Sequence, residues 1–362
     1  MLKQQKIFFD FLRFCIGSAK DIPSSLKEAD WEELYAIAQK QCLVGVLFDG
    51  IKKLPAEHVG MKKELLLQWM AESQMLEKAN AWLNVAAIQV FEWFRKKGFR
   101  TCILKGQGNA LMYPNPYSRT PGDIDIWVEG GDKRVVSFVR SISPHEKACY
   151  HHIEFPSYKG VEVEVHYRPS FLLCFWHNRK LQKYYERVKE EQFSHRVMLG
   201  EHGEVAIPMV EFNLIFQLTH IFSHLMNEGI GLRQLLDYYF VLSMFSVNCE
   251  MLTSLQKELK ELGLWKFAGA IMYIMQEVFG MPASRLIIPP NEKYGKFVLN
   301  EVLEAGNFGK HDARNRFGRS QLGHNFQRVY RDMRLVRYFP AEALCEPLFR
   351  VWHFFWRLKH RR

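Results

Sequence analysis

The chain has 362 residues, of which 48% are hydrophobic and 24% are charged, and its formal net charge is +10. This balance is typical of a folded globular protein and excludes a disordered chain. Most of the excess positive charge lies in residues 310–362, which favours a local anionic partner over a surface that binds nucleic acid throughout. The seven cysteines form no CxxC pair, so they indicate neither a zinc ribbon nor a disulfide framework. No run reaches the about 18 apolar residues of a membrane span, and a protein of the reducing cytoplasm is expected.

Residues 1–98 are predicted to form an N-terminal helical region. The first stretch, "MLKQQKIFFDFLRFCIGSAKD", has charges at Asp10 and Arg13 inside its apolar run. It therefore indicates an amphipathic helix and not a signal peptide. A second long stretch, residues 62–99, closes with two lysines and Gly98, which is typical of a helix C-terminus.

Residues 99–208 have a different pattern of apolar and polar residues and are predicted to form a small α/β core. The runs "RTCILKG" and "DIDIWVE" indicate strands, and "GDKRVVSFVRSI" indicates a helix. Further on, "HHIEF" and "VEVEVH" indicate two strands joined by a turn at residues 157–160. A helix over residues 175–193 and a hairpin with the turn "GEHG" follow.

Residues 209–362 are predicted to be helical again. His220 and His224 lie four residues apart on one helix face, where a satisfied pair at an interface is the preferred interpretation and metal ligation the alternative. Arg233 and Asp237 have the same spacing and are expected to form a salt bridge, with a contact to nucleotide or acceptor as a secondary hypothesis.

The last segment, "EPLFRVWHFFWRLKHRR", alternates aromatic and basic residues. It indicates either a packed last helix with a basic end or a basic amphipathic helix that contacts an anionic surface, such as a membrane or a nucleic acid. The loop "GNFGKHDARNRFGR", which contains Arg314, Arg316 and Arg319, is interpreted as a solvated turn.

Two strands carry acids on one face. In "RTPGDIDIWVE", Asp123 and Asp125 point the same way because strand side chains alternate between faces. In "VEVEVH", Glu162, Glu164 and His166 share one face in the same manner. If these strands stand side by side, the two aspartates and one glutamate converge on a single point.

Three converging carboxylates are hard to keep ionised without a cation. Their oxygens on rigid strands suit Mg²⁺ or Mn²⁺, which also accept phosphate oxygens as ligands. The pattern therefore predicts a site for phosphoryl or nucleotidyl transfer. Solvated acids on half-exposed strands are the alternative.

The turn in "LKGQGNAL" precedes these acids. Backbone amides at such a turn can hold phosphate, and Lys105 can add charge. The turn is neither a dinucleotide fingerprint, because Leu111 replaces the third glycine, nor a Walker A loop, because the lysine precedes the glycines.

The segment "ILKGQGNALMYPNPYSRTPGDIDIWV", followed by "VEVEVH" and by a helical part with the two histidines and the Arg–Asp pair, resembles the uncharacterised nucleotidyltransferase family. That family belongs to the polymerase-beta-like nucleotidyltransferase superfamily. The resemblance covers roughly residues 30–245 and is most specific around residues 103–128. It implies an α+β fold, in which a small mixed-sheet nucleotidyltransferase core is embedded between N-terminal and C-terminal helical regions.

The resemblance also implies the catalytic residues. Asp123 and Asp125 match the metal-binding pair of the superfamily, and Glu164 matches the third carboxylate, which helps to activate the acceptor hydroxyl. All three are expected to be catalytic and to bind Mg²⁺ or Mn²⁺. Glu162 is the alternative third carboxylate.

Nucleotide binding is expected from Lys105, Gly106 and Arg119. Gly106 matches the glycine of the phosphate turn, and Arg119 occupies the place of an arginine often found just before the two aspartates. Gln107 stands where the superfamily usually has the serine of a Gly-Ser turn.

The expected function is metal-dependent transfer of a nucleoside monophosphate from a nucleoside triphosphate, such as ATP, to an acceptor hydroxyl. The sequence does not identify the acceptor, which could be a protein, a small molecule or an RNA end, nor the base preference or the oligomeric state. The alternative is a catalytically silent nucleotide-binding protein, or a membrane or nucleic-acid adaptor that uses its helical flanks. The missing serine favours the silent protein, whereas the intact carboxylates favour the enzyme.

Overall fold

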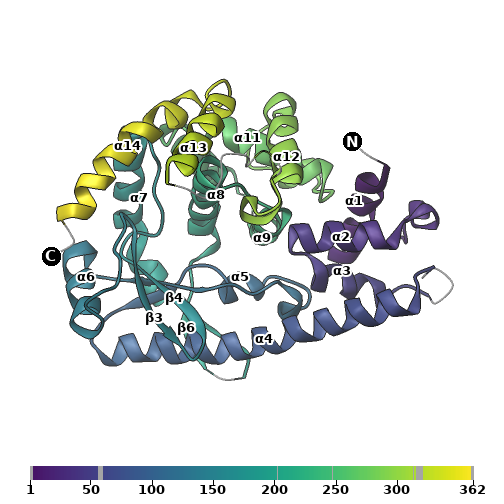
Figure 1. Cartoon of the computed structure of the whole chain (residues 1–362), viewed down its shortest axis with the longest axis horizontal. Coiled ribbons are helices and arrows are strands. Elements are labelled where there is room, and N and C mark those ends of the chain that lie inside the picture. Colours follow the sequence, from purple (N-terminus) through teal and green to yellow (C-terminus); the bar gives the residue numbers. More distant parts are fainter. Residues whose placement is uncertain are drawn as a thin grey trace.

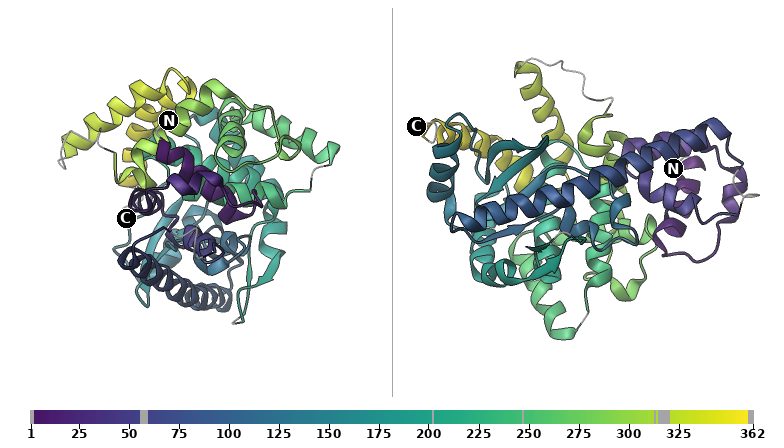
Figure 2. Two further views of the ribbon diagram at one scale, coloured as in Figure 1. Left: turned by 90° about the vertical axis from the view of Figure 1, so that its right-hand side faces the viewer. Right: turned by 90° about the horizontal axis from the view of Figure 1, so that it is seen from below.

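A helix of 34 residues, α4 (Lys63–Lys96), runs along one side of the molecule (Figures 1 and 2). The computed structural model describes residues 3–55, 60–201, 203–246, 248–312, 314 and 321–359. One part of α4 contacts the N-terminal helices, and another part contacts the central sheet. The helix ends where the sequence predicts, because Gly98 follows with a φ of +80°, a conformation that favours glycine.

The chain before α4 is helical, as predicted. Its elements are α1 (Lys3–Ile16), the 3₁₀ helix η1 (Ser24–Glu28), α2 (Trp31–Gln41) and α3 (Val44–Ile51). Helix α1 is amphipathic and buries Phe8, Phe11 and Leu12 in the core. Asp30 caps the N-terminus of α2, because its carboxylate accepts hydrogen bonds from two backbone amides of the first turn.

The central sheet has four strands in the order β1-β2-β4-β3. They are β1 (Thr101–Ile103), β2 (Ile124–Val128), β3 (His152–Tyr158) and β4 (Val161–His166). Strand β2 is antiparallel to β1 and parallel to β4, whereas β3 and β4 form an antiparallel hairpin. The sheet is therefore mixed, as predicted.

Strand β2 is buried on both faces. Strand alternation places Ile124, Ile126 and Val128 on one face, and Asp125 and Trp127 on the other. The ring of Trp127 lies 4.6 Å from a phenylalanine ring of α7 (Phe175–Ser194) and 5.8 Å from one of α8 (Val210–Asn227). The face that bears Asp125 is therefore covered by helices.

Short elements connect the strands. They are α5 (Gln107–Ala110), η3 (Pro116–Ser118), α6 (Gly131–Ile142), and the predicted hairpin of β5 (Arg196–Met198) and β6 (Glu204–Ala206). The remaining helices follow α8 and are α9 (Leu232–Met244), α10 (Cys249–Glu261), α11 (Trp265–Glu277), η4 (Ala283–Arg285), α12 (Glu292–Ala305), η5 (Asn307–Gly309), α13 (Gln321–Leu335) and α14 (Pro340–Lys359). Helices α10 and α11 are separated by a turn that contains Gly263 at φ +70°.

The C-terminal predictions have mixed outcomes. Arg314 is not solvated as expected, because its guanidinium contacts Glu301 at 2.7 Å and Asp312 at 2.8 Å. Arg316 and Arg319, and likewise residues 360–362, lie outside the described residues. Helix α14 buries Phe349 in the core, as expected of a packed last helix.

The chain is α+β, with helical flanks around a small mixed sheet, as predicted. One cluster of buried side chains extends from Ile7 to Phe349. The division at residues 98 and 208 stays a prediction. None of the helices in the described residues combines the length and the apolarity needed to cross a membrane.

Candidate active site

The two acid-bearing strands lie side by side. Strands β2 and β4 pair in parallel with Asp125 directly opposite Glu164, and Asp123 immediately precedes β2. One carboxylate oxygen from each of these three residues lies within 4.8 Å of the others. Glu162, two residues earlier on β4, is exposed and does not belong to this group.

Two cationic groups contact the carboxylates. The Nζ atom of Lys105 lies 2.8 Å from Oδ1 of Asp125. The Nε2 atom of His166 lies 2.9 Å from the same Asp125 oxygen and 3.2 Å from Oε2 of Glu164. The side chains of Asp125 and His166 are nearly inaccessible to solvent and that of Lys105 is only 17% exposed, so water weakens these contacts little.

The pKa values reflect this arrangement. Burial acts to lower the pKa of Lys105, but Asp125, Asp123 and Glu164 outweigh burial and raise it. Burial also acts to lower the pKa of His166, but its hydrogen bonds to Asp125 and Glu164 raise it to about 9. Both groups are therefore cationic at neutral pH.

The pKa values of the two aspartates are shifted in opposite directions. Burial acts to raise the pKa of Asp125, but Lys105 and His166 hold it below its usual range. The charge of Asp125, followed by burial, raises the pKa of Asp123. Asp123 thus experiences the repulsion expected from two neighbouring acids, which the charge of Lys105 offsets only in part.

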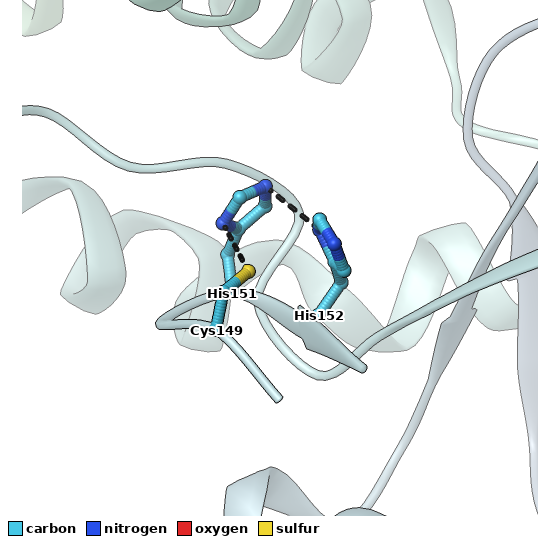
Figure 3. Close-up of side chains that lie close together, drawn as sticks. All are labelled: Cys149, His151 and His152. Carbon is cyan, nitrogen blue, oxygen red and sulfur yellow. Dashed lines mark hydrogen bonds between the residues drawn. The ribbon is translucent and has the colours of Figure 1, made fainter. Parts of the chain in front are cut away.

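A group of softer ligands lies beside the carboxylates. Cys149, His151 and His152 lie close together at the start of β3 (Figure 3). The Nδ1 atom of His152 lies 3.4 Å from Oε2 of Glu164. Burial lowers the pKa of His152 to about 4, holds the pKa of His151 well below its usual range, and raises the pKa of the Cys149 thiol to about 11.

Helix α8 contributes the two histidines predicted to share a face. His220 accepts a hydrogen bond at Nε2 from Nζ of Lys105 at 3.3 Å, and the rings of His220 and His224 are 4.3 Å apart. Both line the same cavity as the carboxylates. The pair therefore faces the candidate site, with Nε2 of His220 hydrogen-bonded to Lys105 and Nδ1 of His224 at 3.4 Å from Oε2 of Glu228.

Arg119 is buried and lines the same cavity as the carboxylates. Its guanidinium forms two hydrogen bonds of 2.8 Å to the carboxylate of Asp237, which also accepts a hydrogen bond of 2.7 Å from Tyr113. The expected salt bridge between Arg233 and Asp237 is wrong: Arg233 donates instead to the backbone oxygen of Thr120 at 3.1 Å. Arg119 precedes β2, and its guanidinium is the cation that contacts Asp237 on α9.

The three carboxylates, Lys105, Arg119 and the histidines named above line one cavity of about 430 Å³. Its walls come from the turn after β1, the start of β2, the β3–β4 hairpin and α8. At the turn, Gly106 has a φ of +56°, which favours glycine, and a Cβ there would lie 3.5 Å from the backbone oxygen of Asp123. The phosphate turn and the carboxylates are therefore adjacent.

The donor set fits a hard divalent cation. Three carboxylates supply oxygen ligands of the type that Mg²⁺ and Mn²⁺ prefer, and the raised pKa of Asp123 shows that this side of the group is short of positive charge. Asp123 and Glu164 are partly accessible from the cavity. The roles of Asp123, Asp125 and Glu164 as metal ligands and catalytic residues stay predictions. The roles of Lys105, Gly106 and Arg119 in nucleotide binding also stay predictions.

Sequence reasoning overlooked Cys149, His151 and His152. The only signal was local, a cysteine and two adjacent histidines immediately before a strand in "CYHHIEF". Strand alternation in "VEVEVH" placed His166 on the acidic face but assigned it no role. That role depends on the register that brings His166 to both Asp125 and Glu164.

Comparison with known proteins supports nucleotidyl transfer as the general activity. No curated protein and no solved structure matches the chain. A family model described as uncharacterised nucleotidyltransferase matches residues 27–280, a span that includes all the site residues named above. It confirms the resemblance carried by the glycine turn and the two acid-bearing strands. The chain therefore belongs to the uncharacterised nucleotidyltransferase family.

Proposed function

We propose that this protein transfers a nucleoside monophosphate from a nucleoside triphosphate to an acceptor hydroxyl, with Asp123, Asp125 and Glu164 as ligands of Mg²⁺ or Mn²⁺. The proposal depends on one observation: oxygens of these three carboxylates lie within 4.8 Å of one another on the wall of a large cavity. A bound divalent ion would supply positive charge to the phosphate oxygens and to the attacking oxygen.

The residues around the carboxylates have complementary tasks. Lys105 lies between the phosphate turn and Asp125, so its ammonium group is placed to exchange a carboxylate contact for a phosphate oxygen. Gly106 lets the chain turn beside Asp123 without a side chain in the way. His166 donates to both Asp125 and Glu164 and so fixes their orientation.

In the proposed chemical step, one bond to phosphorus forms and one breaks. The acceptor oxygen attacks the α-phosphorus, the bond from that phosphorus to the bridging oxygen of the β-phosphate breaks, and pyrophosphate leaves. The acceptor proton passes to a base, for which Glu164 is the candidate because it is ionised and borders the cavity.

Label transfer tests the proposal. Full-length protein is incubated with α-labelled nucleoside triphosphates, Mg²⁺ or Mn²⁺ and candidate acceptors, and both label incorporation and pyrophosphate release are measured. Glu164→Gln should reduce the rate by at least about 100-fold. Glu162→Gln is the matched control, since Glu162 is exposed on the same strand, and should keep wild-type activity. Transfer that survives both Asp123→Asn and Asp125→Asn would contradict the metal assignment.

We also propose that α14 contacts an anionic lipid surface. Leu344, Leu348, Val351, Phe355 and Leu358 repeat at alternating steps of four and three, and each is between 43% and 65% exposed. Within the described part of α14, the acids Glu342 and Glu346 are buried, whereas Arg357 and Lys359 are exposed. In the described part of α14, exposed apolar side chains are thus combined with exposed basic side chains. Such a surface is complementary to anionic lipid.

Vesicle sedimentation tests this contact. Wild-type protein should bind vesicles that contain anionic lipid, bind zwitterionic vesicles less, and lose binding in Phe355→Glu. Met75→Glu is the control, because Met75 is 70% exposed on a different helix. Equal binding by wild type and Phe355→Glu would refute the lipid contact. Lipid-free dimers that Phe355→Glu dissociates would instead assign this face to a second copy of the chain.

A further inference from the structure

Cys149, His151 and His152 bring three metal-ligating side chains into four residues of sequence. One ligand atom from each lies within 4.8 Å of the other two. The Sγ atom of Cys149 is 3.5 Å from Nδ1 of His151, and Nε2 of His151 is 3.1 Å from Nδ1 of His152 (Figure 3). All three side chains line the cavity that contains the carboxylates.

These distances suit a tetrahedral ion. Bond lengths of about 2.3 Å to sulfur and about 2.05 Å to nitrogen place neighbouring sulfur and nitrogen ligands about 3.6 Å apart, and two nitrogen ligands about 3.3 Å apart. The contact between Cys149 and His151 has this spacing already. The remaining change is a rotation of the imidazole rings, because only one nitrogen of each ring binds the ion.

The backbone of the three residues is held in place. The amide of Cys149 donates to the carbonyl oxygen of His152 at 2.9 Å, and the carbonyl oxygen of His151 accepts from the amides of Tyr167 and Arg168 at 3.0 and 3.1 Å. The hydroxyl of Tyr167 donates to the carbonyl oxygen of Cys149. The ligands are therefore presented by a fixed turn at the edge of the sheet, which reduces the entropy lost when an ion binds.

A buried imidazole nitrogen without a hydrogen-bond partner among the described residues lies on His166, next to this cluster. The ring of His166 lies 5.4 Å from that of His151 and 5.2 Å from that of His152. Its Nδ1 atom is buried and has no hydrogen-bond partner among the described residues. A water molecule or substrate oxygen on an ion held by the neighbouring side chains is the kind of group that this nitrogen requires.

We propose that Cys149, His151 and His152 bind one soft divalent metal ion, of the class represented by Zn²⁺, beside the carboxylate group. Thiolate and imidazole ligands select such an ion over Mg²⁺, whereas the carboxylates select Mg²⁺ or Mn²⁺. Three protein ligands leave the fourth position to water or substrate in the cavity, as in catalytic and not structural zinc sites. This site goes beyond the proposed transfer reaction, because metal binding can be measured without an acceptor.

A second cysteine-containing cluster is the natural comparison. Cys174, His177 and Glu342 also have ligand atoms within 4.8 Å. The carboxylate of Glu342, however, already accepts hydrogen bonds from the backbone amides of Leu173 and Cys174. That carboxylate is committed to holding α7 and α14 together, so the cluster is less suited to an ion.

Metal titration of the full-length protein tests the proposal. Protein freed of metal with a chelator and kept reduced is titrated with Zn²⁺ against a chromophoric competitor, and Co²⁺ serves as a spectroscopic probe. We expect one tightly bound Zn²⁺ per chain and, with Co²⁺, a thiolate-to-metal charge-transfer band together with the visible bands of a tetrahedral site. Cys149→Ser should weaken Zn²⁺ binding by more than the about 10–100-fold that loss of a supporting residue costs.

Matched variants locate the ion. Cys249→Ser should bind like wild type, because Cys249 is exposed and outside the cluster. His152→Gln provides a second test if Cys149→Ser does not fold. Absence of stoichiometric Zn²⁺ binding, or a Co²⁺ spectrum without the thiolate band, would overturn the proposal. Loss of Zn²⁺ in Cys174→Ser or Asp123→Asn, with full binding retained in Cys149→Ser, would overturn it as well.

Discussion

The buried pair of Arg119 and Asp237 yields a quantitative prediction. Both side chains are less than a tenth exposed, and two hydrogen bonds of 2.8 Å join them. Asp237→Asn removes the negative charge and leaves the guanidinium groups of Arg119 and Arg233 buried close to each other, where burial and then the charge of Arg119 already lower the pKa of Arg233. Breaking such a pair costs about 3–5 kcal/mol of unfolding free energy, and we expect Asp237→Asn to fall in that range.

Urea denaturation at neutral pH measures the loss. Arg119→Met with Asp237→Leu removes both charges, so the double variant should recover most of the stability lost in Asp237→Asn. Tyr113→Phe is a milder comparison, since it removes only the hydrogen bond of 2.7 Å to Asp237. If Asp237→Asn lies within about 1 kcal/mol of wild type, a typical single-substitution effect, the pair does not act as a buried ion pair.

Three further predictions concern charge and backbone conformation. Asp123→Asn should leave the urea midpoint unchanged or raise it, because it relieves the repulsion from Asp125, whereas a clear drop would refute that repulsion. Gly106→Ala should cost about 1–3 kcal/mol in the same assay, since φ +56° combined with ψ −108° is strained for alanine, and no loss would mean that the turn relaxes. Burial, followed by the charge of Glu346, raises the pKa of Asp332 from 3.8 to about 7. The unfolded chain therefore binds fewer protons than the native chain between these values, so stability should fall as pH rises from 3.8 to 7. Asp332→Asn should flatten that part of the stability profile, and an unchanged slope would contradict the shift.

The sequence predicted the parts of the site that depend on local periodicity. Alternation along a strand is a backbone property, so the shared face of Asp123 and Asp125, and that of Glu164 and His166, followed from the residue spacing alone. Which glutamate stands opposite Asp125 did not follow. That choice is set by the parallel register of β2 and β4, which pairs Asp125 with Glu164.

Contacts between distant segments could not be predicted. Arg119 and Asp237 are 118 residues apart, and the local spacing of Arg233 and Asp237 favoured the wrong partner. A spacing of four residues permits a contact on a helix face, but a buried carboxylate pairs with whichever cation the tertiary structure brings nearest. The same limit explains why the histidines at the start of β3 had no assigned role.

The net charge around the three carboxylates determines whether a divalent ion binds better alone or together with a nucleotide. Asp123, Asp125 and Glu164 face two cationic groups, Lys105 and His166, which leaves one negative charge without compensation. A divalent ion alone would then give the group an excess of positive charge, which is costly in a buried site. A nucleoside triphosphate brings several negative charges, and it gives Lys105 phosphate oxygens in place of Asp125. The ion and the nucleotide should therefore bind together, each raising the affinity for the other, because the negative charges of the nucleotide offset the excess positive charge that the ion brings.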